Sequence, residues 1–189
     1  KLDEALSLWR THFGLEVRAE REGADDGLSR LWGLKKDDIR RQALVAAPGV
    51  ATGMIHLVEF THPGPVIREG AQAFDEVPKN LDIYVQDMPS RVDALRKAGY
   101  RFRNEHYSEV TAPDGTQFRE IHLPSHDGIN VVLLEVIGLA MPFNSAGFSG
   151  VGPLITIVND AASERAFFQD IIGLSMLSEN LLDGPEIEK

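Results

Sequence analysis

Histidine is the residue type in this sequence that is best suited to chemistry, because imidazole is a common metal ligand and acid–base group. His56 stands inside the apolar run GMIHLVEF, which is typical of a strand. His122 and His126 are separated by a Pro-Ser corner, so they do not share a helical face and we expect them at a solvated turn. The sequence has no glycine-rich phosphate loop and no Gly-x-Ser-x-Gly elbow. Nucleophilic catalysis therefore has no support.

Composition and charge limit the function classes further. The 189 residues are 43% hydrophobic and 25% charged, as in an ordinary globular chain with one good core or two small ones. The formal net charge of -10 opposes phosphate neutralisation, so we expect no nucleic-acid partner. No apolar run suits a bilayer and the start, KLDEALSLWR, does not show the pattern of a signal peptide, so we expect no membrane partner and a cytoplasmic protein. The absence of cysteine excludes disulfides, thiolate zinc sites and a cysteine nucleophile.

A repeated spacing organises the chain. When Gly14 is aligned with Gly173, SLWRTHFGLEV falls over AFFQDIIGLSM, so an apolar-aromatic or aromatic pair, four residues and Gly-Leu recur. A third copy shares the strand ending, because LDIYVQD and LITIVND have the same apolar positions and the same closing Val-x-Asp. This spacing predicts one structural unit used three times.

Each unit is predicted to be βαβββ. NLDIYVQD alternates as a half-buried strand does, and the next residues place Val92, Leu95 and Ala98 at helical spacing before Gly99 ends the helix. The runs RFRNEHY, FREIHLP and INVVLLEV follow as strands, with turns at PDG and HDG. We therefore expect one mixed sheet of these four runs, backed by the helix.

The first unit has the same order, from LDEALSLWRTHF as its helix to GMIHLVEF as its last strand, but its first strand is absent. We expect residues 1–140 to form an N-terminal pair of modules, 141–149 a linker, and 150–189 the start of a second, incomplete domain. The sequence is then part of a longer chain. The alternative is a shorter protein that borrows a strand from a partner.

The large aromatic side chains are expected in the core. Trp9 and Phe13 in the first unit, and Phe167 and Phe168 in the third, stand on the module helix. Such side chains pack against the sheet that the helix covers. Trp32 is placed in the core for the same reason.

Together these features resemble the vicinal oxygen chelate superfamily, which includes glyoxalases, bleomycin-resistance proteins, epimerases and extradiol dioxygenases. The resemblance rests on the repeated βαβββ units, the Val-x-Asp strand ending, the helix that ends in Gly-Leu, and the closing run DG…VVLLEV. It implies the glyoxalase-like fold, an α+β fold in which βαβββ modules pair into a curved mixed sheet around a cup. The third unit is most similar to the start of the extradiol enzymes' catalytic domain, which implies a two-domain type.

The resemblance also assigns ligand positions. A first-strand metal ligand would stand seven residues before the terminal aspartate, which gives Asn80 and Pro153, and last-strand ligands would stand at Val132 and His56. Proline and valine have no side-chain donor atom, so His56 alone could bind a metal well. We expect no metal at Pro153. We take His56, Asn80 and Val132 as substrate-binding residues that face one cup.

The nearby carboxylates Glu59 and Glu135 do not supply the missing metal ligands. Glu59 and Glu135 lie three residues beyond the last-strand positions, so they face the opposite side of the pleat. Divalent iron, manganese or zinc needs about three protein ligands. No cofactor is visible in these residues, although the resemblance leaves a divalent metal open for a longer protein.

Two functions remain. The first is a small-molecule enzyme of the glyoxalase or extradiol-dioxygenase type, in which a divalent metal chelates vicinal oxygens, but with the visible ligand positions largely lost. The alternative is a metal-free small-molecule binding protein of the bleomycin-resistance type. Both imply a small-molecule ligand, and we expect a homodimer. The sequence assigns no catalytic residue.

Overall fold

The computed structural model describes residues 1–65, 70, 72, 75, 76, 78–112, 114–176 and 179. The chain divides into two compact units, Lys1–Thr156 and Ile157–Lys189, and each is treated by itself. Across the described ranges, no helix is long and apolar enough to cross a bilayer.

An antiparallel three-stranded sheet follows the first helix. The elements are α1 (Leu2–Leu6), the π-helical turn η1 (Ser7–His12), β1 (Glu16–Glu22), α2 (Asp26–Trp32), β2 (Ile39–Ala46) and β3 (Ile55–Phe60). The strand order is β1-β2-β3. Helix α2 interrupts the expected succession of strands, and it begins at Asp25, whose carboxylate accepts hydrogen bonds from the backbone of Gly27 and Leu28. Such N-terminal caps satisfy amide groups that have no partner within the helix.

A five-stranded sheet forms the rest of the first unit. Its elements are β4 (Pro78–Val85), α3 (Met88–Lys97), β5 (Ser108–Thr111), β6 (Gln117–Pro124), the short 3-10 turn η2 (His126–Gly128), β7 (Asn130–Val136) and β8 (Phe148–Thr156). The order is β5-β6-β7-β4-β8, with β4 and β7 parallel and the other pairs antiparallel. The predicted α+β class and βαβββ module are confirmed, since β4, α3, β5, β6 and β7 follow in that order.

One strand of this module lies elsewhere than expected. RFRNEHY, residues 101–107, is not a strand, and the chain joins the sheet only at Ser108. The segment forms a loop that is held by individual hydrogen bonds and not by a strand ladder. The backbone amide of Arg103 donates to the carbonyl of His122 at 2.9 Å, and the Arg96 side chain donates to the Glu105 carbonyl. Only four residues remain for β5.

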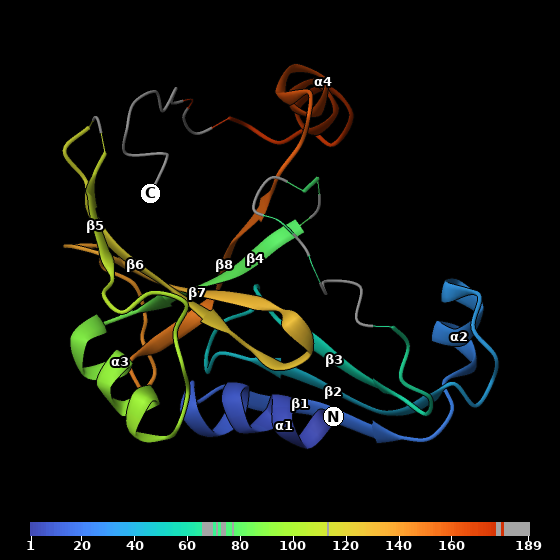
Figure 1. Ribbon diagram of the computed structural model, residues 1–189. Helices are drawn as coiled ribbons and strands as arrows, with labels where there is room; N and C mark the ends of the chain where they lie inside the picture. Colours follow the sequence, from blue (N-terminus) through green and yellow to red (C-terminus); the bar gives the residue numbers. More distant parts are fainter. Residues whose placement is uncertain are drawn as a thin grey trace. The chain divides into compact units, whose positions relative to one another are not determined.

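A single apolar core joins the two sheets. Helix α3 covers one face of the five-stranded sheet and α1 covers one face of the three-stranded sheet (Figure 1). The core cluster includes residues of both helices and of strands β2, β3, β4, β6 and β7. In the strands these residues alternate along the chain, and they include Ala43, Val45, Leu57, Ile83, Ile121, Leu123, Val131 and Leu133. The intervening side chains therefore point away from the core.

The sequence repeat corresponds to a shared backbone turn. In unit 1 the amide of Phe13 bonds to the carbonyl of Leu8, and in unit 2 the amide of Ile172 bonds to that of Phe167, both across five residues. The second turn is η3 (Phe167–Ile171), which follows α4 (Ala161–Ala166). Both turns end at a glycine with positive φ, 67° at Gly14 and 81° at Gly173. The repeated spacing thus encodes a helix that widens by one residue before the glycine.

The expectation that all the large aromatics lie in the core is wrong for three of them. Trp9 and Phe13 are fully buried, but Trp32, Phe167 and Phe168 are 46%, 44% and 47% exposed. Trp32 is the last residue of α2, which adds no apolar residue to the core cluster. The repeated sequence spacing predicts the backbone turn, whereas the burial of the aromatic side chains depends on which other elements pack against them.

Pro153 lies inside a strand rather than at its start. Strand β8 begins at Phe148, and its pairing with β4 shifts register between Leu81 opposite Leu154 and Ile83 opposite Val151. Two residues of β8, Gly152 and Pro153, thus lie opposite the single residue Asp82 of β4, which is a bulge. Because proline cannot donate to a strand ladder, a bulge is one of the few places within a sheet that tolerates it.

Candidate functional site

The face of the five-stranded sheet that turns away from α3 carries most of the sheet's buried and half-buried polar side chains, and we call it the polar face. It is made by the strand positions that alternate with the core residues of β4, β6 and β7. Val132 stands at its centre, opposite Asp82 on one side and His122 on the other. The polar face comprises Asn80, Asp82, Glu120, His122, Asn130 and Val132.

Hydrogen bonds link four residues in a row at this face. Arg103 donates through Nε to Oδ1 of Asn130 at 3.0 Å. The amide nitrogen of Asn130 lies 2.9 Å from Nδ1 of His122, and Nε2 of His122 lies 2.9 Å from Oε1 of Glu120. The row therefore crosses from the loop before β5, over β7, to β6.

This row fixes which nitrogen of His122 carries hydrogen. Since Arg103 can only donate, it holds the Asn130 oxygen on its own side and turns the amide nitrogen toward His122. An amide nitrogen also only donates, so Nδ1 of His122 must accept. The remaining nitrogen, Nε2, then carries the hydrogen and donates to Glu120.

Asp82 is the most enclosed carboxylate of the polar face. It is 4% exposed, and Nδ2 of Asn80 donates a hydrogen bond to its Oδ1. Burial raises the pKa of Asp82 above its ordinary value, and the nearby negative charge of Glu120 raises it further. The hydrogen bond from Asn80 and the proximity of His122 act in the opposite direction. A buried carboxylate that is shifted by desolvation and by a like charge marks a candidate functional site.

A second polar row lies on the three-stranded sheet, also on the side away from the core. Nε2 of Gln42 donates to Asp25 at 3.0 Å, which leaves Oε1 of Gln42 2.9 Å from Nε2 of His56. His56 therefore donates through Nε2. The Trp32 ring lies 6.4 Å from the His56 ring, centroid to centroid. The pKa of Asp25 is lowered, first by the backbone hydrogen bond from Leu28 and then by the Gln42 amide.

The predicted substrate-binding residues fall into two groups. Asn80 and Val132 lie on the polar face, two residues apart in the register of β4 and β7. His56 lies in the other sheet, in the row with Gln42. All three occupy strand positions that alternate with residues of the core cluster, and Val132 is itself only 1% exposed. Their role in binding stays a prediction.

The sequence interpretation missed the residues beside them. His122 was expected at a solvated turn, but it lies within β6 and is half-buried, so that expectation is wrong. His126 does lie in a turn, where its Nε2 contacts Nε1 of Trp9 at 2.9 Å. The available signal was the alternation of Glu120 and His122 with the core residues Ile121 and Leu123.

Glu59 and Glu135 lie on the opposite side of the pleat from the ligand positions, but they do not face outward, since each side chain is only 13% exposed. Glu135 pairs with Arg119 at 3.1 Å and accepts a hydrogen bond from the backbone of Asp87 at 2.7 Å. Glu59 accepts from the backbone of Leu2 at 3.3 Å. Both are thus occupied on the helix-covered side of their sheets.

The donors at the superfamily's ligand positions do not fit a resident divalent metal. Asn80 offers a weak amide oxygen, while Val132 and Pro153 offer no side-chain donor. His56 donates through Nε2, so only its Nδ1 could bind a metal, and the other positions would not supply the remaining donors. Among the residues that the structure describes, no group of three or more His, Cys, Asp or Glu is placed to hold a metal ion.

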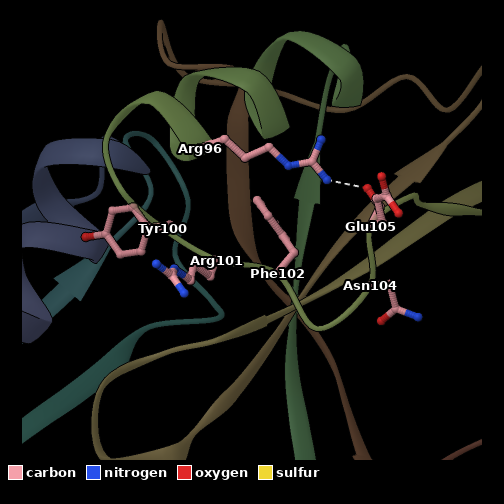
Figure 2. A pocket seen from close by; sticks show the side chains of 6 residues that line it. All are labelled: Arg96, Tyr100, Arg101, Phe102, Asn104 and Glu105. Atoms are coloured by element: carbon pink, nitrogen blue, oxygen red, sulfur yellow. Dashed lines mark hydrogen bonds between the residues drawn. The ribbon is translucent and has the colours of Figure 1, made fainter.

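An open depression of 540 Å³ lies on the opposite side, between α3 and the loop before β5. Figure 2 shows Arg96 reaching across it to Glu105, with Tyr100 and Asn104 directed apart. The Arg96 guanidinium also lies 5.5 Å above the Phe102 ring. Because the polar groups do not converge and Arg96 is already engaged, we place the candidate site at the polar face.

Comparison with known proteins agrees on the fold. No protein-family model matches the sequence, and no curated protein matches it. A glyoxalase family protein from Bacillus cereus superposes with a TM-score of 0.61 at 22% identity, over 73% of this chain and 88% of that one. A "putative dioxygenase" from Bacillus subtilis superposes with a TM-score of 0.60 at 13% identity, over 94% of this chain. The chain spans 53% of that protein's length. The chain therefore has the glyoxalase-like fold that these two proteins share.

Proposed function

We propose that the chain binds a small organic molecule at the polar face and does so without a resident metal. The observation that supports this most is Asp82, a carboxylate that is only 4% exposed and has no ion pair among the described residues. Enclosing such a group lowers stability, and structures retain it where it has a task. Asn80 and Val132, predicted from the sequence to contact the ligand, are its neighbours.

The composition of the face suits this function. The half-buried side chains of Leu134 and Tyr84 offer apolar surface beside the polar row, and small-molecule sites combine apolar walls with a few placed polar groups. Glu120 and His122 have side chains that are 33% and 34% exposed, so a ligand can reach them from solvent. Asp82 lies at the enclosed end of the same group.

The test is an NMR screen of small aromatic and polar fragments against the isotope-labelled protein. We expect backbone amide shifts to cluster at residues 80–84, 120–122 and 130–134. The variant His122→Ala should weaken the best fragment at least tenfold. His106→Ala, at a side chain that is 87% exposed, should leave binding unchanged. Shifts that cluster instead at residues 96–105 would move the site to the depression beside α3.

An enzyme of the glyoxalase or dioxygenase type, with a divalent metal, is the second candidate. Its support is the fold shared with the two Bacillus proteins and the presence of His56 at a ligand position. Elemental analysis after dialysis separates the two candidates. Stoichiometric iron, manganese or zinc that is lost in His56→Ala would favour the enzyme.

We propose further that the chain is a cytoplasmic homodimer. The net charge of -10 supports solubility, and the proposal on assembly carries over the expectation from the superfamily resemblance. Light scattering coupled to size exclusion gives the mass directly. A mass near 20.9 kDa would contradict the dimer.

A further inference from the structure

The three-stranded sheet carries an exposed tryptophan beside an exposed histidine. Trp32 is the last residue of α2 and is 46% exposed, and His56 stands on β3. Their ring centroids lie 6.4 Å apart and the ring planes are tilted by 39°, so the imidazole is not stacked flat on the indole. A single exposed aromatic side chain is common on protein surfaces. This one differs in how its surroundings are held.

One carboxylate positions both members of the pair. Asp25 caps α2, the helix that carries Trp32, by accepting two backbone hydrogen bonds through Oδ1. Its other oxygen, Oδ2, accepts from Nε2 of Gln42 at 3.0 Å, and Oε1 of Gln42 lies 2.9 Å from Nε2 of His56. Gln42 is only 7% exposed, so its amide has exchanged water for these two partners. The start of α2 and the His56 ring are therefore oriented by the same group.

This row leaves an acceptor beside the indole. Because the Gln42 oxygen accepts from Nε2 of His56, the neutral imidazole has its lone pair on Nδ1. Within the part of the chain that the structure describes, no residue hydrogen-bonds to this Nδ1. Leu44 lies opposite His56 on β2 and is half-buried, which adds apolar surface. The pair thus combines an aromatic face, an apolar neighbour and one fixed hydrogen-bond acceptor.

We propose that Trp32 and His56 bind a planar aromatic group that carries a hydrogen-bond donor, such as a ring N–H. The ring stacks on the exposed indole face, and the donor bonds to Nδ1 of His56. A stacked ring lies about 3.5 to 4 Å from the indole, so a donor at its edge can come within about 3 Å of the imidazole, whose centroid is 6.4 Å away. The inference goes beyond the proposed function, because this second site lies on the other sheet.

Other ligands fit these residues less well. A divalent metal at Nδ1 of His56 would have one protein ligand, since both ends of the Gln42 amide are engaged. An aliphatic group would lack the added attraction between two aromatic rings. An aromatic group without a donor would cover Nδ1 and leave it without a hydrogen bond, which costs binding energy.

The experiment compares indole, 1-methylindole and cyclohexanol at pH 8, where an imidazole side chain is ordinarily neutral. Each is titrated into the isotope-labelled protein with a metal chelator present, and dissociation constants come from amide shifts. We expect the indole shifts to cluster at residues 28–32, 42–44 and 54–58. Indole should bind about fivefold more tightly than 1-methylindole, as expected for one neutral hydrogen bond, and about tenfold more tightly than cyclohexanol.

Two variants separate stacking from the hydrogen bond. Trp32→Leu should weaken both indoles about tenfold. His56→Phe keeps a flat ring but has no acceptor, so indole and 1-methylindole should bind this variant equally. Leu31→Ala changes a neighbouring side chain on α2 that is 77% exposed, and it should leave indole binding unchanged. Amide spectra of the variants show that each is folded.

The outcomes separate this inference from the proposed function. If indole shifts residues 80–84, 120–122 and 130–134 instead, the polar face is supported and this inference is wrong. If the wild type binds both indoles equally, or Trp32→Leu has no effect, indole only adheres to apolar surface and the inference is also wrong. If indole binds at Trp32 and His56 while no fragment binds the polar face, the proposed function is contradicted and this inference is supported.

Discussion

The side-chain amide of Asn130 lies 2.9 Å from Nδ1 of His122, and this contact determines where the imidazole hydrogen sits. The same amide is held from its other end by Arg103 at 3.0 Å. Arg103, in a loop, thus fixes the orientation of the Asn130 amide, and this orientation fixes which nitrogen of His122, in a strand, accepts a hydrogen bond.

Asn130→Asp should move the hydrogen on His122. A carboxylate at residue 130 accepts rather than donates, so it favours hydrogen on Nδ1 while Glu120 retains the one on Nε2. Nitrogen-15 NMR should show a single protonated ring nitrogen in the wild type and two in the variant. Asn104→Asp, at an exposed loop position, is the control, and an unchanged ring spectrum in Asn130→Asp would refute the assignment.

Asp82→Asn should stabilise the protein at neutral pH while weakening ligand binding. The folded pKa of Asp82 is raised, so the carboxylate costs stability when ionised and the cost disappears below its unfolded pKa of about 3.8. The groups that face it are Asn80, Glu120 and His122. The gain over wild type should grow as pH rises through the folded pKa, and reach about 3 °C in Tm at pH 7. A constant gain from pH 3 to 7 would contradict this cause.

Asp25→Ala should remove the hydrogen bond that orients Gln42 and, through Gln42, the ring of His56. The Asp25 carboxylate caps α2 and also receives the Gln42 amide, which in turn orients His56. We expect α2 to fray and the His56 ring to lose its single fixed hydrogen position, as measured by amide exchange and nitrogen-15 NMR. Because the pKa of Asp25 is lowered, its contribution is complete above pH 3.8 and is lost as pH falls through the folded pKa. Asp26→Ala, one residue further on, should leave His56 unchanged.

Gly53→Ala should cost more stability than Gly49→Ala. Both glycines have positive φ, 66° and 72°, so each alanine costs about 1 kcal/mol in backbone conformation. A Cβ at Gly53 would also meet the backbone carbonyl of Val151 in β8, whereas one at Gly49 meets nothing within 4 Å. Chemical denaturation should show a loss of about 1 kcal/mol for Gly49→Ala and at least about 2 kcal/mol for Gly53→Ala. Equal losses would contradict this prediction, because they would mean that the backbone of β8 at Val151 can move away from the added Cβ without a cost in stability.

The module could be predicted from the sequence because its signals are local. The aromatic-to-glycine spacing follows from a backbone turn, and the closing Val-x-Asp places an aspartate at the N-cap of the next helix. The Asp160 side chain accepts there from the amides of Ala162 and Ser163, whereas Asp87 occupies the N-cap of α3 without a side-chain cap hydrogen bond. The alternation of NLDIYVQD and INVVLLEV likewise requires only that one face be buried. None of these features depends on distant residues.

The site could be predicted only in part because its residues meet across strands. Asn80 and Val132 were found through ligand positions of the resemblance, but Asp82 and His122 meet only when β4 and β6 flank β7. The role of Arg103 was out of reach, since its stretch was taken for a strand. A donor in a loop that orients a side chain on β7 leaves no periodic signal in the sequence.

The π-helical turn that ends both module helices has a consequence for how such modules tolerate change. An α-helix advances about 100° per residue, so the extra residue within Ser7–His12 sets the rotational phase between the helix and Gly14. Deleting one residue there, such as Thr11, would restore α-helical winding and rotate Trp9 away from its fully buried position. The spacing of four residues between the pair that ends in Trp9 and the Gly-Leu at Gly14 therefore cannot change by one residue without disturbing the packing of the helix. Insertions and deletions are better tolerated in the loops of the module than in this interval.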